Sequence, residues 1–142
     1  MTAVELLNRC RETGPKIRAM EAVLDQLRES ASAVSVNLDP NGGSRGGSGE
    51  QDRLGRFACE IADQSEALDA LRKRWSADML ACVKVLVRLS DVQNAVLYRY
   101  YVEGLSVGKV SIVLGYSVGY VKRVKKSGLD ALEGVEADDV NA

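Results

Sequence analysis

The stretch that decides the fold is SVGKVSIVLGYSVGYVKRVKKSGLDAL, residues 106–132. Ser106 and Ser117 each stand where a helix can begin, because a serine hydroxyl can accept a hydrogen bond from an N–H group of the first helical turn. Gly115 lies between them, where a left-handed backbone would end the first helix. The stretch therefore predicts a short helix, a tight Gly-Tyr-Ser turn and a longer helix that runs to about Leu132.

The apolar spacing within the stretch supports the same arrangement. Ser111 is small at the point where we expect the two helices to cross most closely. Apolar side chains occupy the positions that must face inward, namely Leu105, Val110, Val113, Leu114, Val121, Val124, Leu129 and Leu132. Two helices in this succession, with this inward face, form a helix-turn-helix.

Charge is distributed unevenly around the stretch. Residues 104–129 contain five basic side chains and no acidic one, and the last 13 residues contain five acidic side chains and no basic one. We expect the basic segment to bind duplex DNA, with Ser117 to Lys126 in the major groove. The expected DNA-binding residues are Lys109, Ser117, Val118, Gly119, Tyr120, Lys122, Arg123, Lys125 and Lys126.

Within this set, the lysines are expected to neutralise phosphates, and Tyr120 and Arg123 are expected to lie nearest the bases. The alternative is a solvated cationic face that binds nothing. A further short helix should precede the stretch, because Ser90 and Gln93 have capping-box spacing and an apolar pattern continues to near Gly104. The expected DNA-binding domain is therefore 90–133, and the acidic residues 134–142 are expected to be a disordered tail.

Two long helices are expected in front of this domain. Thr2 and Glu5 have capping-box spacing, and an apolar stripe follows until about residue 36. Gly14-Pro15 predicts a kink or a restart of that helix. The Gly, Ser and Asn content of residues 37–50 predicts a flexible loop, and a second apolar stripe predicts a helix from about Gln51 to Arg88, with a slip of the pattern near Asp78.

These features predict an all-α fold in which residues 1–89 form a long antiparallel helical hairpin of the coiled-coil type, followed by the helix-turn-helix. The thin apolar stripes favour pairing with a second copy, so we expect a homodimer through the hairpin. Cys10, Cys59 and Cys82 are far apart in a chain without histidine, so we expect reduced packing residues and no metal site. No catalytic residue, no cofactor and no membrane-spanning segment is expected, which favours a cytoplasmic protein that is not an enzyme.

A resemblance to a known family gives more detail. The segments YRYYVEGLS (98–106), the apolar run 110–114 and GYSVGYVKR (115–123) resemble region 4 of sigma-70-type transcription factors. They are most similar to small phage and prophage proteins that carry this region alone, of the late-transcription-activator and autolysin-regulator type. Those proteins also begin with a long helical segment broken by a polar loop, although only residues 95–132 are specific.

The resemblance implies binding of promoter DNA by the last helix, contact with host RNA polymerase and, if the chain is phage-encoded, a place in the host cytoplasm. Val118 and Gly119 depart from the primary sigma factors, which have an arginine and an acidic residue there, so that promoter preference does not carry over. Region 2 of a complete sigma factor has no counterpart in the hairpin. Two alternatives stay open: a DNA-packaging protein of the small-terminase kind, and a polymerase-binding protein without DNA binding.

Overall fold

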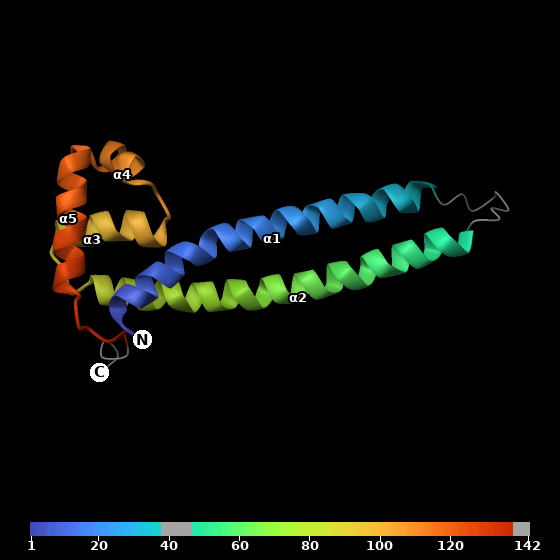
Figure 1. The fold of residues 1–142 in the computed structure, drawn as a ribbon, viewed down its shortest axis with the longest axis horizontal. Coiled ribbons are helices and arrows are strands. Elements are labelled where there is room, and N and C mark those ends of the chain that lie inside the picture. Colours follow the sequence, from blue (N-terminus) through green and yellow to red (C-terminus); the bar gives the residue numbers. More distant parts are fainter. Residues whose placement is uncertain (38–46, 138–142) are drawn as a thin grey trace. The chain divides into compact units, whose positions relative to one another are not determined.

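The computed structural model describes residues 1–37 and 47–137, and the regular secondary structure there is entirely helical (Figure 1). The elements in chain order are α1 (Ala3–Asn37), α2 (Gly47–Leu86), α3 (Asp91–Leu97), a π-helical segment η1 (Tyr98–Val102), α4 (Val107–Leu114) and α5 (Val118–Ala131). The expected all-α class is confirmed. None of the described helices is both long enough and apolar enough to cross a membrane.

The chain divides into two compact units. Unit 1 consists of Met1–Pro15 and Lys73–Ala142, and unit 2 consists of Lys16–Arg72. The division does not follow the expected boundary between residues 89 and 90, because the start of α1 and the end of α2 belong to the same unit as α3, α4 and α5. The helix-turn-helix is therefore part of a larger unit.

The main core of unit 1 explains this division. Side chains from the start of α1, the end of α2 and the C-terminal helices are buried together; they are Ala3, Leu6, Leu7, Cys10, Cys82, Val85, Leu86, Leu97, Tyr101, Val102 and Leu132. The predicted capping box begins α1, since Thr2 N–H donates to Glu5 Oε2 at 2.9 Å and Glu5 N–H donates to Thr2 Oγ1 at 3.1 Å. The N-terminal residues thus contribute directly to the core on which the C-terminal helices pack.

An ion pair joins α1 to α2 in the same unit. Arg9 Nε donates to Asp78 Oδ2 at 2.9 Å, and Arg9 Nη2 donates to Asp78 Oδ1 at 2.7 Å. Asp78 is buried, whereas about a third of the Arg9 side chain is exposed. The hydrogen bond to Asp78 raises the pKa of the Arg9 guanidinium. Asp78 occupies a buried position of the α2 stripe, which is why the apolar pattern slips there.

Arg9→Ala is expected to lower the free energy of unfolding by about 1–3 kcal/mol, because it leaves the Asp78 carboxylate buried without its bidentate guanidinium partner. Asp78→Asn should cost less, since Arg9 then retains access to water. Urea unfolding followed by circular dichroism compares the two variants. Equal losses, or no loss for Arg9→Ala, would contradict the structural role given to this pair.

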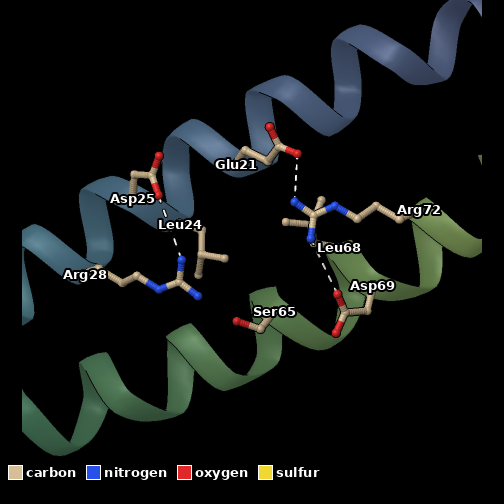
Figure 2. A pocket seen from close by; sticks show the side chains of 8 residues that line it. All are labelled: Glu21, Leu24, Asp25, Arg28, Ser65, Leu68, Asp69 and Arg72. Carbon is tan, nitrogen blue, oxygen red and sulfur yellow. Dashed lines mark hydrogen bonds and ion pairs between the residues drawn. The ribbon is translucent and has the colours of Figure 1, made fainter.

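Unit 2 pairs the rest of α1 with the start of α2 in antiparallel orientation (Figures 1 and 2). Its buried apolar side chains are Ile17, Leu24, Val34 and Leu68. Arg72 of α2 reaches Glu21 of α1 at 2.8 Å and Asp69 of its own helix at 3.6 Å, beside a hollow of about 430 Å³ (Figure 2). The narrow apolar stripe predicted for each helix is confirmed, because its members are buried or half-buried.

Two expected interruptions are corrected. The expected restart at Gly14-Pro15 is absent, because α1 is continuous through Pro15. Pro15 removes one backbone hydrogen bond from the helix. Thr13 and Gly14, which directly precede it, are buried, and their packing keeps this part of α1 helical. Asn37 and residues 47–50 of the expected loop are helical, since extending an existing helix by a residue costs less than starting one. The remaining loop residues, 38–46, lie outside the described residues, and α2 ends at Leu86 rather than Arg88.

The three cysteines differ in environment. Cys10 and Cys82 are buried in the core of unit 1, as the packing role predicted, but Cys59 is exposed and has no packing role. The hydrogen bond with Cys10 raises the pKa of the Cys82 thiol, and burial raises it further. The same hydrogen bond lowers the pKa of Cys10.

The start of the acidic tail is ordered, which corrects the expected disorder for residues 134–137. Ala3 N–H donates to the Val135 carbonyl at 2.8 Å, and Ala137 N–H donates to the Met1 carbonyl at 3.1 Å. The terminal ammonium of Met1 lies 3.2 Å from Glu136. Gly134 has φ 77°, the left-handed conformation that turns the chain toward the N-terminus. The rest of the expected tail, residues 138–142, lies outside the described residues.

Candidate nucleic-acid interface

The helix boundaries of the C-terminal module follow from three caps that the sequence predicted. Ser90 and Gln93 form a complete capping box at the start of α3. The hydroxyls of Ser106 and Ser117 accept hydrogen bonds from Lys109 N–H and Tyr120 N–H, each at 3.2 Å. Gly115 ends α4 with φ 74°. The predicted helix, turn and helix are thereby confirmed at nearly the predicted residues.

The π-helical segment η1 was not foreseen from the sequence. It follows α3 without a break and leads to Gly104, which has φ 74°. Arg11 of α1 holds this region, because its Nη1 donates to the carbonyls of Tyr100 and Leu105, and its guanidinium carbon lies 3.8 Å from the centre of the Tyr100 ring. The π-helical turn of η1 has no local sequence signal, because it depends on contacts with Arg11, which is far away in the chain.

A small second core holds the module together. Val96, Val110, Val121 and Val124 are buried in it, and half-buried apolar side chains surround them. One expected core residue is wrong: the Val113 side chain is 53% exposed. The inward face of α4 follows Val107, Val110 and Leu114, and Val113 lies at the flank of this face, outside the core.

A close helix crossing lies between α3 and α5, at Gly128. A Cβ atom on Gly128 would lie 2.8 Å from Leu97 Cδ1, so only glycine fits there without a shift. Ser111 instead closes the turn, since its hydroxyl donates to the Tyr116 carbonyl. Gly119, nine residues before Gly128 on α5, has open space around it, with no atom within 4 Å of an added Cβ.

Alanine at these two glycines is expected to act in opposite directions. Gly128→Ala should destabilise the protein by about 1–2 kcal/mol, because overpacking a buried contact outweighs the better helix propensity of alanine. Gly119→Ala should stabilise it by roughly 0.5–1 kcal/mol, because only the propensity changes. Thermal unfolding of the two variants measures the difference, and an equal shift for both would contradict the close crossing.

The outward face of α5 presents cations. The side chains of Lys122, Arg123 and Lys126 are exposed there, and Lys109 is exposed on α4. None of these four belongs to an ion pair among the residues that the structure describes. Asp130 lies within α5, one turn beyond Lys126. It is the first of the five acidic residues at the end of the chain. The acid-free part of this face therefore covers the first three turns of the helix.

Lys125 and Tyr120 are less available than their neighbours. Lys125 Nζ lies 4.0 Å from the centre of the Tyr100 ring, a cation–π contact that turns this ammonium toward the body of the unit. The Tyr120 ring packs edge-on against Tyr116, with 4.9 Å between ring centres, and borders the second core. Val118 and Gly119 are exposed, and Ser117 is the cap of the helix.

The fold defines a helix-turn-helix module with an exposed basic face on its second helix. Residues 85–133 match the family model described as Sigma-70, region 4, so this part of the chain is similar to the helix-turn-helix of that family. That family is a DNA-binding regulatory domain and not an enzymatic one. No curated protein and no solved structure matches the chain.

Proposed function

We propose that this protein is a transcriptional regulator of the phage or prophage type, which binds promoter duplex DNA by placing residues 117–126 of α5 in the major groove. The observation that carries the proposal is the outward face of α5, where Lys122, Arg123 and Lys126 are exposed and form no ion pair with the acidic residues that the structure describes. Clustered cations of this kind neutralise DNA phosphates, and a helix-turn-helix directs its second helix at the groove.

The exposure of the individual residues supports different roles for them. Lys109, Lys122 and Lys126 bind phosphates, and Lys125 contributes less because its ammonium lies over Tyr100. Arg123 lies nearest the bases, where its guanidinium can pair with both major-groove acceptors of a guanine. Tyr120 supports the turn through its ring contact with Tyr116, and its half-buried side chain offers less surface to the bases than the exposed side chain of Arg123 does.

Selection of bound duplexes from a random pool, followed by gel-shift titration, tests DNA binding. The expected result is an enriched sequence that is bound more tightly than an unrelated duplex of equal length. No shift of any duplex even at a low salt concentration of about 50 mM would overturn the proposal.

We further propose that α4 contacts host RNA polymerase. The Ile112 side chain is 81% exposed and the neighbouring Val113 is also exposed, which supports a protein partner on this side of the helix. Ile112→Asp should abolish activated transcription in a purified system while promoter binding is retained. Unchanged transcription would exclude this contact, and the loss of both activities would show that the variant is misfolded.

A homodimer is the oligomeric state we propose. Leu80, Val83 and Val87 are exposed at spacings of three and four residues, which places them on one side of the end of α2 and the turn after it. Mass measurement in solution tests this, with Val83→Asp as the variant expected to give monomers. A ring of eight or more subunits would favour DNA packaging instead, and a wild-type monomer would exclude the dimer.

A further inference from the structure

Val118 is an exposed apolar side chain beside the basic face of α5. It is 43% exposed, and it belongs to neither core of unit 1. It precedes Lys122 by four residues, so the two side chains lie on the same side of the helix, one turn apart. An isolated exposed valine is ordinary on a protein surface. This one, however, stands in the first turn of the helix whose corresponding turn contacts base edges in helix-turn-helix proteins.

Gly119, the next residue, has no role in the folded protein that requires glycine. Its φ is not positive, since the described residues with positive φ are Gly104, Gly115 and Gly134. No atom lies within 4 Å of an added Cβ, so no neighbour requires a small residue there. Glycine inside a helix is less favourable than alanine. The absence of a side chain leaves the helix surface open there to the close approach of a ligand.

We propose that Val118 and the space above Gly119 receive the 5-methyl group of a thymine in the major groove, so that the module selects a T·A pair at this position. This inference rests on the proposed function and names the base that the apolar part of the site reads. Thymine is the DNA base that presents a methyl group in that groove. A cytosine there would place its N4 amino group against the valine, where Val118 offers no hydrogen-bond acceptor for it.

The surrounding charges make a nucleic acid the occupant of this apolar spot. Lys122 and Lys126 continue the same exposed side of α5, and Arg123 lies next to Lys122. A protein partner with an apolar surface would gain nothing from this row of cations, none of which forms an ion pair among residues 1–37 and 47–137. A DNA groove offers phosphates to the lysines and a base edge to the valine at once.

The test replaces thymines of the selected duplex, one at a time, with deoxyuridine, which pairs in the same way but lacks the 5-methyl group. The wild-type chain should bind one of these duplexes about fourfold more weakly, the loss expected when a single methyl group is no longer buried. Val118→Ala should bind the thymine and deoxyuridine duplexes equally. Val113→Ala, which removes the same atoms from an exposed valine of α4, is the matched control and should retain the fourfold difference.

The outcomes separate the inference from the proposed function. Equal affinity of the wild-type chain for every thymine and deoxyuridine pair would overturn the inference and leave DNA binding intact. A fourfold difference that persists in Val118→Ala would assign the methyl contact to another residue and overturn it as well. No binding to any duplex would overturn the proposed function itself.

Gly119→Ala gives a second and independent readout. The added methyl group should weaken binding to the thymine duplex more than to the deoxyuridine duplex, because it occupies the space that receives the 5-methyl group, while the melting temperature does not fall. Unchanged affinity in this variant would overturn the role given to Gly119.

Discussion

Deletion of residues 1–15 is expected to unfold the helix-turn-helix module, although these residues are distant from it in the sequence. Ala3, Leu6, Leu7 and Cys10 are buried in one core with side chains of the C-terminal helices. Arg11 also donates hydrogen bonds to two carbonyls at η1 and the loop after it. Removing the segment exposes the apolar side of the remaining helices to water. The free energy of unfolding of a small domain is too low to tolerate this loss.

A point substitution in the same core should destabilise unit 1 to a smaller degree. Leu7→Ala should lower the free energy of unfolding of unit 1 by about 2–5 kcal/mol, because Leu7 is fully buried and leaves a cavity. Urea unfolding followed by the fluorescence of Trp75, the single tryptophan of the chain, reports on this unit because the ring packs against its core. Leu24→Ala, which removes a buried leucine from unit 2, is the matched control and should leave the Trp75 transition in place. Cooperative folding of an isolated 85–133 fragment would contradict the shared core.

The second large effect is expected from charge removal on α5. Combined substitution of Lys122, Arg123 and Lys126 by alanine should weaken duplex binding by roughly 10²- to 10³-fold at about 0.1 M salt, because two phosphate neutralisations with their counterion release, and the guanine contact of Arg123, are lost. The folded structure should survive, since all three side chains are exposed. Gel-shift titration against the selected duplex measures the affinity, and circular dichroism verifies the fold.

A matched triple variant controls for the change in net charge. Lys16, Arg18 and Lys73 are likewise exposed basic residues, and none of them lies in the helix-turn-helix. Their substitution by alanine alters the net charge of the chain by the same amount and should reduce affinity only slightly. Equal losses in the two triple variants would mean that binding follows net charge and not the face of α5.

Local signals in the sequence predicted the helix-turn-helix well. Serine caps and a turn glycine act on residues that are close in the chain, so their positions can be read without knowledge of the rest of the fold. Ser106, Gly115 and Ser117 mark the ends of α4 and α5 within a residue or so of the prediction. The apolar stripes of α1 and α2 were equally readable, because their spacing is a property of the helix itself.

Features that depend on distant residues could not be predicted in this way. The shared core, η1 and the ordered residues 134–137 all require the N-terminal segment as a partner. Gly128 has no local sequence signal either, because the contact that requires glycine is made with Leu97 of another helix. The exposure of the candidate DNA-binding residues could not be predicted for the same reason. Lys125 is less exposed than the other lysines of α5 because its ammonium contacts Tyr100, and the sequence around Lys125 does not indicate this contact.

The salt dependence of duplex binding tests the central claim most directly. If Lys109, Lys122, Arg123 and Lys126 each meet the DNA backbone or groove, the logarithm of the association constant should fall with the logarithm of salt concentration at a slope of roughly −3 to −5 per bound module. The slope should shrink to about −1 in the variant that lacks Lys122, Arg123 and Lys126. A slope that stays the same in that variant, or no binding at low salt, would contradict the assignment of α5 as the DNA-binding helix.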